Sequence, residues 1–154
     1  MRKLSSTPIY MGLMFSGVLI LSLSSYRADA AEVITIDIES QALNLDDGVV
    51  SEVTGEPAVE PSGADVLFAY NADRTPHAVA CPAEEGVEIA FVDNIGFDGV
   101  SSADVANLSF SVEAIDLPLE SGDAVVIRTD TGAVYKLGNA VESASTVTIN
   151  YEQI

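Results

Sequence analysis

Apolar and polar residues alternate along several short stretches of this chain, which is the pattern of half-buried β-strands. Ile34, Ile36 and Ile38 share one face of the first stretch. The same two-residue period recurs over residues 64–70, 87–92, 108–113 and 146–151. The positions predicted to face inward there are Val66, Phe68, Tyr70, Val87, Ile89, Phe91, Leu108, Phe110, Val112, Val147, Ile149 and Tyr151.

A β-hairpin is predicted over Asp123–Leu137, where two apolar runs flank a Thr-Asp-Thr-Gly sequence. A two-residue loop would set a cation, Arg128, on the apolar face. A three-residue loop, with Gly132 as its left-handed residue, instead pairs Ile127 with Tyr135 and separates the two kinds of side chain. We favour this second register. It puts Val125, Ile127, Ala133, Tyr135 and Leu137 on one face, and Val126, Arg128, Val134 and Lys136 on the other.

The strand pattern predicts an all-β domain of about eight short strands. A parallel sheet needs crossover helices of about a dozen residues, and no segment has a helical period of that length. We therefore expect an antiparallel β-sandwich or a partly closed barrel. Residues 51–63, with two prolines and two glycines, predict an exposed loop. In the turn-rich stretch 93–104, one helical turn over 102–107 would be capped by Ser101 or Ser102.

The first 30 residues have the features of a secretory signal peptide rather than of a fold. Two cations precede the apolar stretch Met11–Leu23, and Ala28–Ala30 has the A-x-A form of a cleavage site. The apolar stretch is shorter than the ~20 residues of a spanning helix, so an uncleaved anchor is the weaker alternative. We expect one mature domain, residues 31–154, that is secreted to the extracellular space, the cell surface or the periplasm and has no membrane span.

The charge of the chain excludes some partners. The chain has 6 Lys and Arg against 24 Asp and Glu, a net charge of −18. Loss of residues 1–30 would leave three cations, 23 acids and a charge of −20. Nucleic acid and anionic membranes repel such a surface. Because the acids are scattered singly, we interpret them as a solvated coat, with cation binding as the alternative.

Few residues of this chain suit catalysis. His77 and Cys81 are the only histidine and cysteine, and four positions along a strand would separate them by about 13 Å. The apolar neighbours of Cys81 raise the pKa of a thiol rather than lower it. No serine lies in a G-x-S-x-G turn, and no carboxylate pair stands out for a glycosidase. We expect no enzymatic activity and no catalytic residue.

Oxygen-rich turns are the candidates for a metal site. A closed zinc site needs four histidine or cysteine ligands, whereas calcium takes the oxygen ligands that are abundant here. Acid-rich clusters precede Gly48 and Gly99, but neither has the spacing of a D-x-D-x-D-G loop. Asn, Asp and Gly also form turns without any metal, so calcium is the only cofactor that we consider. The candidate calcium ligands are Asp46, Asp47, Asp93 and Asp98, beside Asn44 and Asn94.

The scarce cations carry more information than the acids. In the favoured register Arg128 and Lys136 share a face of the hairpin, and Glu152 joins them if the last strand pairs with it. We favour a cross-strand ion network on a solvated face over a binding site for an anionic group.

Six segments occur in an order that is similar to a known pattern. An acidic turn is followed by an A-D strand, a strand leading to F-D, a V-R-T-x-x-G-x-Y-A-K-like hairpin and an aromatic strand. In this order the chain resembles a β-rich module of secreted bacterial proteins, often repeated, whose function is not characterised. The resemblance implies an extracellular β domain and no catalytic residue, and its most distinctive part is the hairpin. The matching segments are Leu45–Gly48, Ala64–Val66, Gly86–Ile89, Phe97–Asp98, Ile127–Lys136 and Val147–Tyr151.

These patterns together predict a non-enzymatic secreted or surface-associated β domain with an interaction or structural role. Its partner would be a protein or a glycan. The first alternative is a calcium-assisted module that binds a ligand such as a carbohydrate. The second is a small secreted hydrolase.

Overall fold

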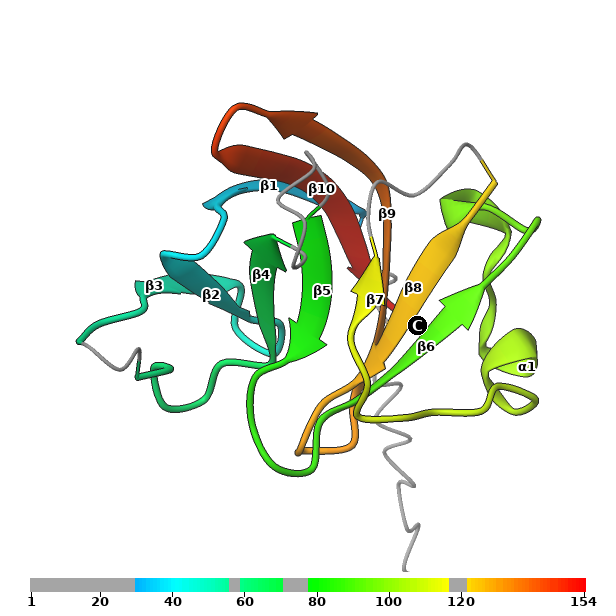
Figure 1. The fold of residues 1–154 in the computed structure, drawn as a ribbon. Coiled ribbons are helices and arrows are strands. Elements are labelled where there is room, and N and C mark those ends of the chain that lie inside the picture. Colours follow the sequence, from blue (N-terminus) through cyan, green and yellow to red (C-terminus); the bar gives the residue numbers. More distant parts are fainter. Residues whose placement is uncertain (1–29, 56–58, 71–77, 117–121) are drawn as a thin grey trace, which may run out of the picture.

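A computed structural model describes residues 30–55, 59–70, 78–116 and 122–154, and residues 78–81 in their backbone only. The described residues form two antiparallel sheets that pack face to face (Figure 1). The all-β prediction is therefore confirmed, as a sandwich. The expected signal peptide lies outside the described residues except for Ala30.

The first sheet has the strand order β1-β10-β9-β8-β6, and every neighbouring pair is antiparallel. Its edge strands are β1 and β6. The strands are β1 (Glu32–Asp37), β6 (Glu88–Val92), β8 (Ala124–Arg128), β9 (Val134–Ser143) and β10 (Thr146–Gln153).

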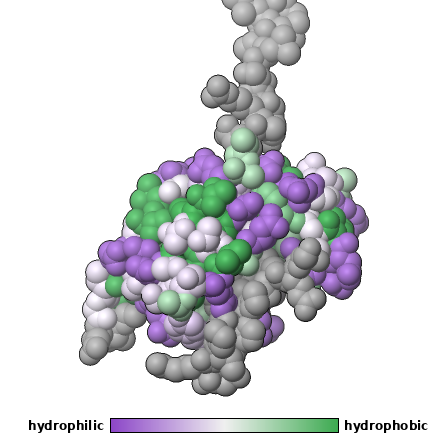
Figure 2. Space-filling model, turned by 90° about the horizontal axis from the view of Figure 1, so that it is seen from above, coloured by the Kyte–Doolittle hydropathy of each residue, from purple (hydrophilic) through white to green (hydrophobic). Residues whose placement is uncertain are grey.

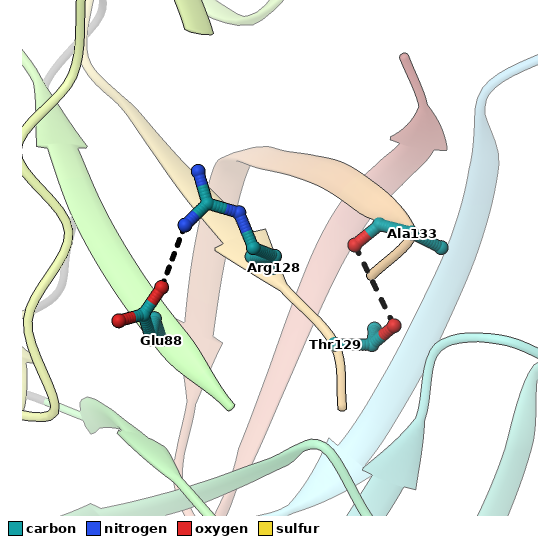
Figure 3. A network of polar contacts seen from close by, with 4 residues as sticks. All are labelled: Glu88, Arg128, Thr129 and Ala133. Atoms are coloured by element: carbon teal, nitrogen blue, oxygen red, sulfur yellow. Dashed lines mark hydrogen bonds and ion pairs between the residues drawn. The ribbon is translucent and has the colours of Figure 1, made fainter. Parts of the chain in front are cut away.

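The hairpin β8–β9 has the three-residue loop that the sequence predicts. Ile127 pairs with Tyr135. The Thr129 N–H donates to the Ala133 carbonyl at 2.9 Å, and the Thr129 hydroxyl lies 3.5 Å from the same oxygen (Figure 3). Gly132 has φ +87°, which a residue with a Cβ rarely adopts. This loop sets the register of β8 against β9.

The second sheet has the order β3-β2-β4-β5-β7. The chain crosses into it directly after β1, where the Glu39 N–H donates to the Phe68 carbonyl at 2.7 Å. One boundary differs from the prediction: the loop expected over 51–63 begins later, because β3 continues to Glu52. The strands are β2 (Gln41–Asn44), β3 (Val49–Glu52), β4 (Val66–Tyr70), β5 (Ala78–Pro82) and β7 (Ile115–Asp116).

The core lies between the two sheets and contains most of the residues predicted to face inward. Phe91 is two positions from Ile89 on the same strand but is 46% exposed, whereas Ile89 is 1% exposed, so the predicted burial of Phe91 is wrong. The buried members of this core are Ile36, Ile38, Leu43, Leu45, Val66, Phe68, Val87, Ile89, Val125, Ile127, Tyr135, Leu137, Val147, Ile149 and Tyr151.

The strand predicted over 108–113 is wrong. Only Ser111 forms a bridge, exchanging backbone hydrogen bonds of 2.7 and 2.9 Å with Ile89. Leu108 and Phe110 instead pack on a second apolar cluster outside the sandwich, and Val112 is 72% exposed. A segment that lays alternate side chains on the outside of a sheet has the same two-residue period as a strand within it. The buried members of the outer cluster are Val92, Val100, Ala124 and Val126.

Two short helices carry the chain across this outer face: η1 (Phe97–Gly99) and α1 (Ser102–Val105). The carboxylate of Asp104 accepts the N–H of Ser101 at 2.9 Å and its hydroxyl at 2.6 Å. Ser101 is therefore the capping residue, as predicted. The helix ends at Val105, two residues earlier than expected.

Both described cations form cross-strand ion pairs, but the face that carries them is only partly solvated: the side chains of Arg128 and Glu88 are each 39% exposed. Lys136 lies 3.2 Å from Glu152 and is only 6% exposed. Arg128 lies 2.6 Å from Glu88 (Figure 3). The ring of Phe97 contacts Lys136 and the ring of Phe110 contacts Arg128, with centroid distances of 4.8 and 3.9 Å. The segment 93–110 thus covers a face that the hairpin pattern alone predicts to be open.

The rest of the surface is not uniformly hydrophilic. Seen from above, hydrophobic residues lie in patches between hydrophilic ones (Figure 2). Val33 and Val141 are 67% and 63% exposed despite the acidic composition. The acids therefore form an interrupted coat.

Candidate functional site

A pocket of about 170 Å³ opens at one end of the sandwich, beside the turn that joins β2 to β3. Two tyrosines and four carboxylates line it, so we name it the tyrosine–carboxylate pocket. Its residues come from β1, the turn 45–48, β9 and β10. They include Glu32, Asp46, Asp47, Tyr135, Tyr151 and Glu152.

The two tyrosines are held by carboxylates of the same pocket. Their ring centroids are 6.5 Å apart and the rings are tilted by 47°. The Tyr151 hydroxyl donates to Glu32 Oε2 at 2.6 Å. Burial raises the pKa of Tyr151 to about 12, with Glu32 adding to it, and burial together with the nearby Asp46 raises the pKa of Tyr135 further. Both hydroxyls stay protonated near neutral pH, and that of Tyr151 acts as a hydrogen-bond donor.

Gly48 lets the turn approach Tyr151. A Cβ at this position would lie 2.8 Å from the Tyr151 hydroxyl oxygen, and the φ of +71° also disfavours a side chain. The glycine of the predicted turn thus has a second role, because it shapes the wall of the pocket.

Three carboxylates meet beside the pocket. Asp46, Asp65 and Asp130 each place one oxygen within 4.8 Å of the others. The buried member, Asp65, accepts the Leu45 N–H at 2.7 Å. Burial raises the pKa of Asp65 to about 6, and the charges of Asp46 and Asp130 act in the same direction.

Hydroxyl groups of the hairpin loop join this carboxylate cluster. The hydroxyls of Thr131 and Thr129 lie 2.8 and 3.3 Å from the two carboxylate oxygens of Asp46. The loop defined by Gly132 is therefore tied to the turn 45–48. The result is a set of carboxylate and hydroxyl oxygens contributed by three separate parts of the chain.

The four predicted calcium ligands have different positions. Asp46 belongs to the carboxylate cluster, whereas Asp47 lines the pocket, where its Oδ1 accepts the Val49 N–H at 3.1 Å. Asp93 and Asp98 belong to the segment that covers the outer face. Within the described ranges, no third acid, histidine or cysteine joins Asp93 and Asp98. The structure thus brings one of the four candidates into a cluster.

Sequence reasoning missed the partners of Asp46. Asp65 opens a strand and Asp130 lies in the hairpin loop, where each is one of many single acids. Asp65 lies in the A-D strand and Asp130 in the hairpin of the module that the chain resembles. That resemblance is the one sequence signal that singles out both segments. His77 lies outside the described residues, and the side chain of Cys81 is not described.

Comparisons with models of known families, with curated proteins and with solved structures find no match. Within the described part of the chain, no helix is long and apolar enough to cross a membrane.

Proposed function

We propose that this chain is a secreted or surface-associated β-sandwich domain that acts by binding a partner and catalyses no reaction. The partner would be a protein or a glycan. Export rests on the features of residues 1–30, and the resemblance to an extracellular module agrees with it.

The tyrosine–carboxylate pocket is the observation that supports this proposal best. Concave sites with aromatic walls and a few oriented polar groups are how proteins recognise small chemical groups. The Tyr151 hydroxyl already donates to Glu32, and its raised pKa suits a hydrogen-bonding role better than proton transfer.

A binding screen tests this function. Labelled mature protein, residues 31–154, is applied to glycan and peptide arrays, with the heat-unfolded protein as the control. We expect saturable binding that needs the folded domain. A broad panel of hydrolase substrates is run beside it, and turnover of any substrate above the level of the unfolded control would contradict the non-enzymatic proposal.

Calcium binding is the second candidate, and the carboxylate cluster favours it. Calcium takes six to eight oxygen ligands, and the cluster offers three carboxylates and the hydroxyls of Thr129 and Thr131. A divalent cation there would also offset the mutual repulsion of Asp46, Asp65 and Asp130.

Melting at 1 M NaCl separates a calcium site from a solvated coat, because the Debye length falls to ~3 Å and bulk repulsion is screened. A specific site stabilises by about 2.7 kcal/mol at a hundredfold excess over Kd. If the site exists, calcium raises Tm, magnesium does not, and Asp46→Asn or Asp130→Asn removes the shift. The control is the double variant that carries both Asp93→Asn and Asp98→Asn, and calcium should still raise its Tm. An unchanged Tm in wild type would reject this candidate.

A further inference from the structure

We propose that the tyrosine–carboxylate pocket binds the charged end of a lysine or arginine side chain presented by a partner protein. This inference rests on the proposed interaction function and gives the chemistry of the partner. It concerns the pocket formed by Glu32, Asp47, Tyr135 and Tyr151, not the carboxylate cluster beside it.

The size and walls of the pocket fit an organic cation. A volume of about 170 Å³ is more than one bare metal ion fills. Tyrosine rings attract ammonium and guanidinium groups through their faces and also contact the apolar stem of such a side chain. Tyr135 and Tyr151 line the pocket with little exposed area, so their part is to contact the apolar stem of such a side chain, while the acids meet its charge.

The described cations of this chain neutralise one acid of the pocket, Glu152, and form ion pairs with none of its other acids. Arg128 is paired with Glu88 and stacked on Phe110, on the outer face of the first sheet. Lys136 is likewise buried against Phe97. Of the acids of the pocket, Glu152 has Lys136 as a partner.

The other acids meet hydrogen-bond donors that carry no positive charge. Glu32 accepts the Tyr151 hydroxyl, and Asp47 accepts a backbone N–H. A carboxylate that accepts one hydrogen bond keeps further acceptor positions. A cation from outside would complete their bonding.

The charge of the whole molecule acts in the same direction. At −18 for the full chain, the domain attracts a basic partner over a distance and raises its rate of association at low salt. The net charge attracts any basic partner, whereas the pocket provides a defined position for one charged side chain.

The test is a titration of the ¹⁵N-labelled mature protein with blocked tripeptides, in EDTA so that no calcium competes. Acetyl-Gly-Lys-Gly-amide and its arginine form are compared with the norleucine form, which keeps the alkyl chain and lacks the charge. We expect the two basic peptides to shift the amides of Asp47, Gly48 and Tyr151 saturably, with weaker binding as NaCl increases. The norleucine peptide should cause no such shift.

Charge-matched variants test the location. Glu32→Gln and Asp47→Asn should each weaken binding of the basic peptides about tenfold, a loss of about 1.4 kcal/mol. Asp98→Asn removes one charge on the outer segment and should leave binding within about twofold, since a distant exposed charge is screened. Melting curves show that each variant is folded. Because Asn keeps the acceptor oxygen for the Val49 N–H, Asp47→Asn serves if Glu32→Gln is unfolded.

Several results would overturn the inference: equal binding of the norleucine peptide, equal losses in all three variants, or shifts confined to other residues. Tighter binding of 1,4-diaminobutane than of the lysine peptide would assign the pocket to a free amine instead of a protein side chain. If the peptides fail while the arrays show folded-state binding, the interaction function stands and the pocket is not its site. If both fail, both proposals are rejected.

Discussion

Two turns of this chain are built from the same kinds of residue and have different roles. The first turn, residues 44–48, lies between β2 and β3 and forms a wall of the tyrosine–carboxylate pocket. The second turn, residues 93–99, includes η1 and lays Phe97 on the outer face of the first sheet. Both contain Asp, Asn and Gly, and both were equal calcium candidates from the sequence.

The difference lies in what each turn meets. Asp46 of the first turn faces the loop of the hairpin and the start of β4, which both contribute oxygens. The second turn contains a phenylalanine that is 3% exposed, so its position is set by apolar packing. Turn chemistry determines that the chain reverses, whereas the neighbours determine what the turn does. The following experiments test this division, from the largest expected effect to the smallest.

Phe97→Ala should give the largest loss of stability, about 3–5 kcal/mol, because it removes a fully packed ring. The contact is close: a Cβ built on Gly138 would lie 2.7 Å from the Phe97 Cβ. Urea unfolding measures the loss, and Phe91→Ala, at a half-exposed ring, is the matched control. Equal losses in the two variants would mean that the second turn is not anchored by Phe97.

Asp65 should make the first turn sensitive to pH. Its pKa is raised by burial from 3.8 to about 6, so the folded state favours the neutral form. Below pH 3.8 the contribution of Asp65 to the free energy of unfolding is fully present. That free energy then falls as the pH rises toward 6. Each pKa unit corresponds to about 1.36 kcal/mol, so the free energy of unfolding falls by at most about 3 kcal/mol.

Unfolding of wild type and Asp65→Asn, followed in EDTA from pH 3.5 to 7, isolates this contribution. The stability of wild type relative to the variant should decrease through that interval. A difference that does not change with pH would show that the three carboxylates are not coupled to folding.

Gly132→Val should destabilise the domain by about 1–3 kcal/mol, since a β-branched residue is strained at φ +87°. The space around Gly132 is open, so the loss would come from the backbone alone. The variant also displaces Thr131 from Asp46, which loosens the first turn and not the second. Thermal unfolding measures the loss. A Tm equal to that of wild type would refute the three-residue loop.

Asp104→Asn should have the smallest effect. The hydrogen bond from the Ser101 hydroxyl has the larger effect and that from the Ser101 backbone N–H the smaller, and both lower the pKa of Asp104 below 3.8. The folded state therefore favours the carboxylate, and its contribution is present above pH 3.8 and is lost as the pH falls below that value. The Tm difference between Asp104→Asn and wild type should shrink in acid. A Tm difference that stays constant in acid would contradict the role of the Asp104 carboxylate at this cap.

Much of the fold could be predicted because strand signals are local. The inward positions of β1, β4 and β10, the register of β8–β9 and the Ser101 cap all follow from residues within a few positions of one another. The prediction failed over 108–113, where an alternating segment covers the outer face of the first sheet. A two-residue period indicates that one side of a segment is apolar. It does not indicate which surface of the protein that side packs against.

The sequence by itself determined β1, β4, β6, β10 and the hairpin β8–β9 with its loop, because side-chain alternation and the glycine at φ +87° act within the segment that contains them. Only the tertiary structure decided which of the scattered acids come together. Asp46 and Thr131 are 85 positions apart and their side chains are 2.8 Å apart, because the crossing from β1 into the second sheet brings the first turn to the hairpin loop. The same packing buries Lys136 under Phe97. A carboxylate or a cation has no partner until distant segments meet, so its role depends on contacts that no local pattern contains.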